Sequence, residues 1–252
     1  MNDVIESDIV FVTTTLYTKW LNYQSEIIKK LFPEADHIIV DGTKNWPSSW
    51  FNWINETKKS NKKYYIHIDE DFFITNKTEV VKCIEKMQSD DIDLLGCSDG
   101  YNNYRQHNPV AINTFFMIGK VEHLKDVDFT GIKFKMNNGS YINNFGLHYK
   151  EEYLKGFEYK HEKLSTCKFD DFEPYYSFMW KMKEMGLKFD YLYPHLDDEF
   201  KSTNPRIDEN SDDIGMHMWY VRQWNSNSTA QGVPNKIRYS KLEKYLNKNA
   251  KI

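Results

Sequence analysis

Two aspartates one residue apart are the strongest chemical signal in this sequence. Asp69 and Asp71 directly follow the apolar run 64–68, so their carboxylates are expected to emerge where a buried strand ends. Mg²⁺ and Mn²⁺ prefer oxygen ligands, and proteins usually hold them with one or two carboxylates together with phosphate oxygens and water. The pair therefore predicts a site for Mn²⁺ or Mg²⁺ that also binds a diphosphate. The alternative is a solvated turn at the end of a strand.

A cation held next to a diphosphate suits an enzyme that cleaves a nucleotide-sugar bond. The departing diphosphate gains negative charge in the transition state, and a metal ion neutralises that charge. Glu70, the middle residue of the motif, has no role in this scheme.

A second acidic group precedes an expected helix over 174–185. Asp170, Asp171 and Glu173 stand immediately before Pro174, and proline is favoured at the first position of a helix. Carboxylates at this place can cap the helix, because they accept hydrogen bonds from its free amides and suit its dipole. A carboxylate can equally act as a general base toward a hydroxyl group. Helix cap and base are both compatible with the pattern.

A late histidine adds a possible nitrogen ligand. His217 lies between Met216 and Met218 in the segment 213–224, and neutral imidazole is a common metal ligand. A histidine packed among aromatic side chains is an equally good interpretation, and His195 is the weaker competitor for the ligand role. Arg222 and Lys44 have the charge to pair with diphosphate oxygens.

The elements that must position these residues alternate between strands and helices. Short apolar runs predict strands, and apolar residues at helical spacing predict the helices between them. The expected strands are 8–14, 37–42, 64–71, 92–97, 113–119 and 189–193, and the expected helices are 20–32, 50–57, 77–88 and 174–185. Residues 133–149 are expected to form loops or a hairpin. This alternation predicts an α/β fold with a mostly parallel central sheet flanked by helices.

Ligands of such sheets bind beyond the carboxyl ends of the strands. Polar residues stand at four of these expected ends: Thr13, Thr14, Thr15, Asp41, Asp69, Asp71, Ser98 and Asp99. One crevice can therefore gather them all.

Length and composition fit a single globular domain over 1–252. Hydrophobic residues make up 40% and charged residues 28% of the 252 positions, and no repeat or low-complexity linker divides them. A net charge of -4 offers no basic surface for nucleic acid, and no apolar run is long enough for a membrane span. Three cysteines without a paired spacing, and no secretory signal, lead us to expect a cytoplasmic protein.

The order of these motifs resembles that of the GT-A fold glycosyltransferases, the nucleotide-diphospho-sugar transferases that carry an Asp-x-Asp motif after a central strand. The matching stretches are 9–15, 38–42, 65–71 and 113–119, and with the later acids and histidine the similarity extends over about 8–224. The resemblance implies one GT-A-like domain. Residues 1–110 would form a Rossmann-like half that binds the nucleotide sugar, and 111–252 an acceptor-binding and catalytic half.

The resemblance also implies roles for individual residues. Asp71 resembles the direct metal ligand, and Asp69 the partner that contacts the donor ribose or reaches the metal through water. His217 resembles the histidine that completes the metal site in several of these families. Thr13, Thr14, Thr15 and Asp41 would lie around the nucleoside of a UDP- or GDP-sugar, with Arg222 near its diphosphate.

The same resemblance implies a general base at the start of the later helix. An inverting enzyme uses an acid there to take the proton from a glycan hydroxyl, and Asp171 is the first choice, with Glu173 second. The motif departs from the common Glu-Asp pair, and a retaining enzyme would need no such base.

Two other functions remain compatible with the sequence. A nucleotidyltransferase uses a similar sheet and paired carboxylates, but it usually has a glycine-rich basic loop after its first strand, where this chain has 13–18 without glycine. A catalytically inactive nucleotide-sugar-binding protein would need the crevice but not the acids.

Overall fold

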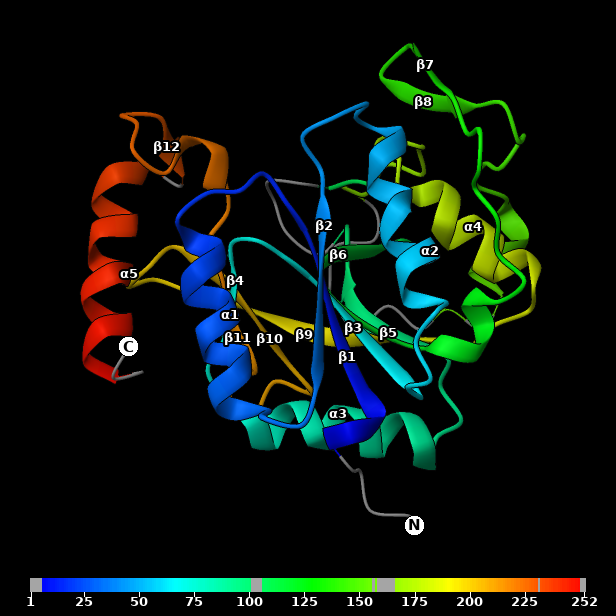
Figure 1. Cartoon of the computed structure of the whole chain (residues 1–252). Helices are drawn as coiled ribbons and strands as arrows, with labels where there is room; N and C mark the ends of the chain where they lie inside the picture. Colours follow the sequence, from blue (N-terminus) through cyan, green and yellow to red (C-terminus); the bar gives the residue numbers. More distant parts are fainter. Residues whose placement is uncertain (1–5, 101–105, 156, 158–165, 231, 250–252) are drawn as a thin grey trace.

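The computed structural model describes residues 6–100, 106–155, 157, 166–230 and 232–249 (Figure 1). Within them lie five α-helices, one large sheet and two small hairpins. The α/β class expected from the sequence is confirmed.

The large sheet has nine strands in the order β2-β1-β3-β6-β5-β9-β10-β11-β4. Their bounds are β1 Ile9–Thr15, β2 Asp36–Asp41, β3 Tyr64–Asp69, β4 Phe72–Ile74, β5 Leu94–Ser98, β6 Ile112–Lys120, β9 Phe189–Asp197, β10 Ser202–Arg206 and β11 Gly215–His217. The strands β3 and β4 are neighbours in the chain but lie at different places in the sheet, and only residues 70–71 separate them.

The sheet is mixed, so the expectation of a mostly parallel sheet was wrong. Parallel pairing is restricted to β1 with β2 and β3, and to β5 with β9. The strand β6 runs antiparallel between β3 and β5, and β9, β10, β11 and β4 pair antiparallel in succession. Short connections such as the one from β9 to β10 suit antiparallel neighbours, whereas a parallel pair needs a longer crossover.

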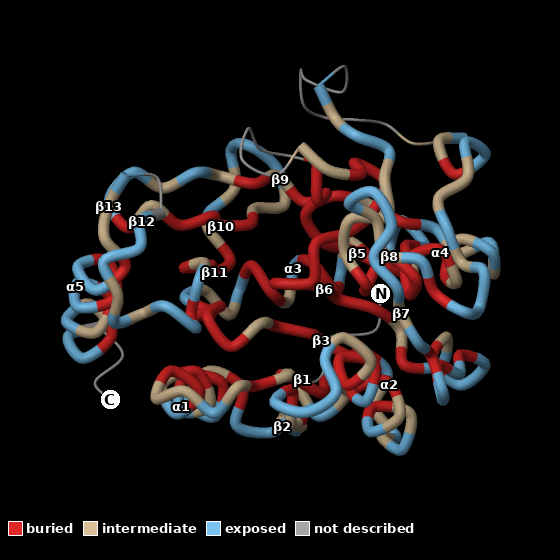
Figure 2. Tube along the Cα trace, turned by 90° about the horizontal axis from the view of Figure 1, so that it is seen from above, coloured by how far each residue is buried: buried red, intermediate tan, exposed pale blue. Residues whose placement is uncertain are grey.

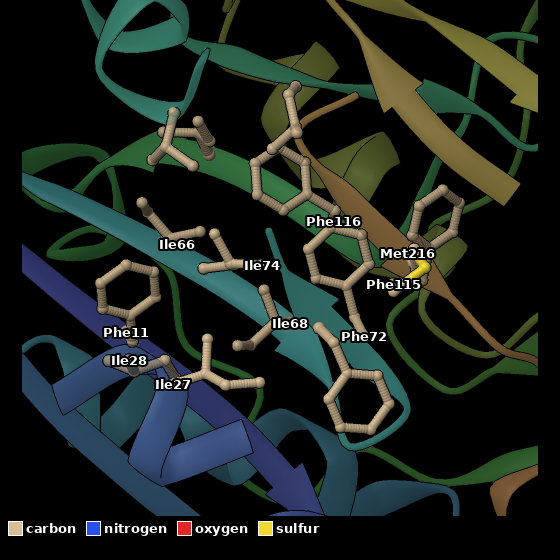
Figure 3. Packing of buried hydrophobic residues seen from close by; sticks show 14 of the residues in the cluster. Phe11, Ile27, Ile28, Ile66, Ile68, Phe72, Ile74, Phe115, Phe116 and Met216 are labelled. Atoms are coloured by element: carbon tan, nitrogen blue, oxygen red, sulfur yellow. The ribbon is translucent and has the colours of Figure 1, made fainter. Parts of the chain in front are cut away.

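Alternating side chains divide the interior into two hydrophobic clusters, as the pleat of a strand requires. On β1, Ile9 and Phe11 point into one cluster and Val10 and Val12 into the other. Figure 3 shows part of the first cluster, with Phe11 beside side chains of β3, β4 and α1. Burial therefore runs through the central strands of the sheet, while the edge strand β2 and the outer faces of the helices are more exposed (Figure 2).

The helices cover both faces of the sheet. The first cluster contains side chains of α1 (Trp20–Leu31), α3 (Lys77–Ser89) and α5 (Asn235–Asn249). The second contains those of α2 (Asn52–Thr57) and α4 (Tyr176–Glu184). The helices expected near 20, 77 and 174 are present, although α4 begins two residues after Pro174.

The expected hairpin is also present. The strands β7 (Phe134–Asn137) and β8 (Ser140–Asn143) form it, and it projects from the body in Figure 1. A second small hairpin pairs β12 (Thr229–Ala230) with β13 (Val233–Pro234). In the part of the chain that the structure describes, no helix combines the length and the apolar character that crossing a bilayer would require.

Candidate metal centre and active-site cavity

Three potential metal ligands converge at the turn between β3 and β4. One ligand atom from each of Asp69, Asp71 and His217 lies within 4.8 Å of the other two. Asp69 is half-buried, and Asp71 and His217 are buried. Residues 148 positions apart in the sequence, 217 minus 69, therefore meet at one point of the fold.

The turn itself is held by a buried glutamine of α1. The side-chain amide of Gln24 donates to the carbonyl oxygens of Asp69, at 2.6 Å, and of Phe72, at 2.8 Å. The carbonyl oxygen of Gln24 accepts from the hydroxyl of Thr13 on β1. Gln24 thus fixes the backbone at both ends of the acidic turn, and the hydrogen bonds of its own side chain are satisfied.

Asp71 is the most enclosed of the three ligands. One carboxylate oxygen lies 3.1 Å from Nε2 of His217, and the other accepts the amide of Val221 at 3.2 Å. Burial on its own would raise the pKa of Asp71, but the neighbouring His217 and the Val221 amide outweigh it and lower that pKa. The carboxylate is therefore ionised at neutral pH, as a metal ligand must be.

His217 ends β11, which pairs with β4 so that His217 stands opposite Phe72. Its ring stacks on Phe115, with centroids 4.4 Å apart, and Trp219 covers another side at 4.1 Å. Its Nδ1 atom is buried and has no hydrogen-bond partner among the described residues. The imidazole is both packed and placed next to Asp71, so the two interpretations of this histidine are compatible with each other.

A glycine permits the close approach of β11 to β4. A Cβ atom on Gly215 would lie 2.5 Å from the carbonyl oxygen of Phe73 and 2.7 Å from the ring of Phe72. Any larger residue would push β11, and His217 with it, away from the acidic turn.

The segment after His217 is held by the C-terminal helix α5. Buried Arg238 donates to the carbonyl oxygens of Met218, Phe200 and Lys201, and the hydroxyl of Tyr239 donates to that of Trp219 at 3.1 Å. These contacts fix the backbone that supplies the Val221 amide to Asp71.

The three candidate ligands line a cavity of about 470 Å³, a volume typical of small-molecule sites. Its walls come from the ends of β1, β2 and β3, from the start of β6, from the segment that begins at the end of β11, and from the segment before α4. The lining residues are Thr14, Leu16, Gly42, Trp46, Trp50, Asp69, Glu70, Asp71, Asn113, Thr114, Glu173, Tyr175, His217, Trp219, Tyr220, Val221, Arg222 and Gln223. Among the described residues of this lining, Arg222 is the one lysine or arginine, against four acids.

Glu70 has a structural function that the sequence did not suggest. It is 3% exposed, and its carboxylate accepts the amides of Leu16, at 2.7 Å, and Thr18, at 2.6 Å. The middle residue of the motif therefore anchors the loop after β1 to the acidic turn, and Leu16 of that loop lines the cavity.

The threonines expected around a nucleoside point in different directions. Thr14 lines the cavity, and its hydroxyl has no partner among the described residues. Thr13 and Thr15 are fully buried, and their hydroxyls bond to Gln24 and to the amide of Tyr17. Alternation along β1 explains the difference, because neighbouring side chains lie on opposite faces of the strand.

Asp41 lies outside this cavity and lines a second one together with Lys44. Its carboxylate accepts the amide and the hydroxyl of Thr43, and these bonds lower its pKa. His195, the alternative ligand, contacts Asp213 and Arg206 and has no place in the metal cluster.

The two acids considered as general bases, Asp171 and Glu173, lie in different surroundings. Glu173 lines the cavity. Asp171 does not, because its carboxylate accepts the indole N–H of Trp180 at 2.6 Å and the amide of Tyr149 at 3.1 Å. Burial raises the pKa of Asp171. Of these two acids, Glu173 is therefore the one that lies at the cavity. Neither caps α4, whose N-cap is Tyr175 without a side-chain hydrogen bond.

Arg222 is exposed at the mouth of the cavity, and its guanidinium group lies 5.6 Å from the ring centroid of Trp46. The aromatic walls formed by Trp46, Trp50 and Tyr175 were not identified from the sequence. Their types suit a sugar or base site, but aromatic residues are common throughout this chain, so the sequence offers no signal that singles them out.

Comparisons with known proteins give weak similarities only. No protein-family model matches the chain, and no curated protein matches it significantly. Solved structures that are similar include A197 from STIV, with 11% identity and a TM-score of 0.39 over 50% of this chain and 71% of that one. A glycosyltransferase involved in glycosylation of the major capsid of PBCV-1 has 10% identity and a TM-score of 0.37 over 46% and 62%.

A third similar structure is the mannosyltransferase PcManGT from Pyrobaculum calidifontis in complex with GDP-Man and Mn²⁺. It has 10% identity and a TM-score of 0.35, over 52% of this chain and 48% of that one. Similarities at this level leave the function to be argued from the site itself.

Proposed function

We propose that this chain is a metal-dependent glycosyltransferase that uses Mn²⁺ or Mg²⁺ to transfer a sugar from a UDP- or GDP-sugar to a hydroxyl group of a glycan acceptor. The observation that carries the proposal is the convergence of Asp69, Asp71 and His217 at the base of a cavity that also contains Glu173. Residues from 14 to 223 line this cavity, so we treat the chain as a single functional domain.

The donor set fits a hard or borderline divalent cation. Two carboxylates suit Mg²⁺ and Mn²⁺, and the imidazole shifts the preference toward Mn²⁺. The Nδ1 atom of His217 is buried and lacks a hydrogen-bond partner in the described part of the chain, and the pKa of Asp71 is lowered; both observations agree with side chains prepared for ligation. A cation held by these three residues would need further oxygen ligands, which phosphate groups and water can supply.

The charge of the cavity supports metal dependence independently. Among the described residues that line the cavity, the four acids Asp69, Glu70, Asp71 and Glu173 outnumber the one cation, Arg222, so this lining on its own repels a diphosphate. A bound divalent cation would supply the positive charge that accepts the diphosphate and stabilises it as a leaving group. Arg222 is placed to add a charge-assisted hydrogen bond to a phosphate oxygen.

We assign the role of general base in an inverting transfer to Glu173, because it lines the same cavity as the candidate metal ligands. Its carboxylate takes the proton of the acceptor hydroxyl as the acceptor oxygen forms a bond to the anomeric carbon. The bond from that carbon to the diphosphate oxygen breaks on the opposite side, and its electron pair leaves on the diphosphate. Trp46, Trp50 and Tyr175 form aromatic walls that exclude water and offer flat surfaces to a sugar or a base.

The proposal is tested by direct product analysis. The purified protein is incubated with Mn²⁺, each of several UDP- and GDP-sugars and a mixture of oligosaccharides, and released UDP or GDP is measured together with the mass of the acceptor. We expect nucleoside diphosphate and an acceptor heavier by one sugar unit, with both lost on chelation of the metal. Release of pyrophosphate instead would identify a nucleotidyltransferase. Tight metal-dependent donor binding without any product would identify a binding protein.

A further inference from the structure

A second cavity, of about 480 Å³, lies beside the proposed active site. The segment 41–50 forms the wall between the two. Gly42, Trp46 and Trp50 of this segment line the active-site cavity. Their immediate neighbours Asp41, Asn45 and Ser49 line the second one. The two cavities are thus separated by a single stretch of backbone.

Half of the twelve residues that line the second cavity have uncharged polar side chains. Amides and hydroxyls predominate over the one acid and one base, Asp41 and Lys44, and they belong to Asn45, Ser48, Ser49, Asn52, Asn55 and Thr130. Amide and hydroxyl groups both donate and accept hydrogen bonds, as the hydroxyls of a sugar do. Buried Ser49 adds an Oγ atom without a hydrogen-bond partner among the described residues.

An aromatic floor complements these polar walls. Phe51 and Phe129 both line the cavity, and their ring centroids lie 4.6 Å apart. Both side chains are at least 95% buried, so the floor is rigid. A sugar ring presents C–H groups on its faces and hydroxyls around its rim, and it therefore matches an apolar floor with polar walls.

The charges of this cavity do not suit a second nucleotide. The carboxylate of Asp41 is held ionised by its bonds to Thr43 and opposes the single Lys44. The described residues contain no second metal cluster that would offset a phosphate.

We propose that the second cavity binds a neutral saccharide unit of the glycan, next to the unit that reacts in the active-site cavity. Binding of the saccharide follows from the cavity alone, whereas its assignment to the acceptor rests on the proposed function. An acceptor long enough to cross the wall 41–50 would then be preferred to a single sugar.

The test uses neutral trisaccharides as probes, namely mannotriose, maltotriose, cellotriose and chitotriose, in saturation-transfer NMR without metal or nucleotide. We expect at least one of them to bind the parent protein and the Asp71→Ala variant equally. The double variant Asn52→Ala/Asn55→Ala should weaken that binding at least tenfold. Glu56→Ala, on the same helix but outside the cavity, should leave it unchanged. Melting curves of all variants establish that they are folded.

Three outcomes would overturn the inference. They are the absence of binding by every trisaccharide, loss of binding in Asp71→Ala but not in the double variant, and displacement of the trisaccharide by free uridine or guanosine. Because no metal or donor is present, these outcomes are independent of sugar transfer. Trisaccharide binding that depends on Asn52 and Asn55, in a protein that transfers no sugar, would support this site and count against the proposed function.

Discussion

The acidic turn 69–71 and the acidic segment 170–173 look alike in sequence but behave differently in the structure. In the first, Asp69 and Asp71 converge on His217, and Glu70 accepts the amides that hold the loop after β1. In the second, Asp171 faces Tyr149 and Trp180, and Glu173 alone reaches the cavity. A carboxylate at the end of a buried strand has its direction set by the pleat, whereas one in an irregular segment takes its direction from distant contacts.

Replacement of Asp71 should have the largest effect. Asp71→Ala removes the most enclosed ligand, so we expect Mn²⁺-dependent binding of nucleotide sugar to fall below detection in calorimetry. Asp198→Ala, a change at an almost fully exposed acid, is the control and should bind as the parent does. If Asp71→Ala still binds donors in a metal-dependent way, the turn 69–71 is not the metal centre.

Replacement of Glu173 should have the next largest effect, because Glu173 is the residue of the acidic segment 170–173 that lines the cavity. An amide cannot take a proton, so Glu173→Gln should lower turnover by about 10²- to 10⁴-fold, the usual contribution of general-base catalysis. Donor affinity and melting temperature should stay close to those of the parent. Turnover at the parental rate would remove the support for an inverting mechanism.

The buried histidine of β3, His67, should make the stability of the fold depend on pH. It lies two residues before Asp69. Burial lowers the pKa of His67 from 6.5 to about 4. Between about pH 4 and pH 6.5, the imidazole of His67 is therefore protonated in the unfolded chain but neutral in the native state. Stability present above pH 6.5 should therefore be lost as the pH falls toward 4, by about 3 kcal/mol. Urea unfolding at several pH values measures this loss. In His67→Asn the same interval should show a correspondingly smaller slope.

His217 should matter less than Asp71, because the two carboxylates remain when it is removed. We expect His217→Ala to weaken Mn²⁺ binding roughly 10- to 100-fold, comparable with the loss of other groups that support a metal ligand. Unchanged Mn²⁺ titration with a lowered melting temperature would instead assign the ring to packing against Phe115 alone.

Asp171→Asn should give the smallest change in turnover. The amide oxygen of asparagine can still accept the N–H groups of Trp180 and Tyr149, so activity should remain within about twofold of the parent for a residue outside the cavity. A hundredfold loss, with Glu173→Gln fully active, would return the base to Asp171.

The contrast between the two acidic segments also describes how far the sequence was informative. Local patterns predicted α1, α3, the hairpin and most strands, because burial imposes a period on the residues of each element. The candidate ligands Asp69 and Asp71 were placed at a strand end for the same reason. Pairing between strands is not a local property, so the antiparallel position of β6 was not predicted. The same holds for the placement of β10 and β11 at the far side of the sheet.

The directions of single side chains were the hardest to foresee. The sequence grouped Thr13, Thr14 and Thr15, but only Thr14 faces the cavity. It placed Asp41 with the nucleoside, whereas the segment 41–50 divides its residues between two cavities. Nothing in the local pattern marks Gln24 or Arg238, whose hydrogen bonds fix the backbone around the metal cluster.

The connection from β3 to β4 bears on the order in which contacts form during folding. The chain makes the acidic turn within two residues, but the contact of Asp71 with Val221 closes a loop of 150 positions. Closure of so long a loop is entropically unfavourable until many other contacts have formed. The centre should therefore be completed late in folding. A cation that binds only the completed centre would slow unfolding and leave the folding rate unchanged. Bound metal would then increase the kinetic stability of the native state.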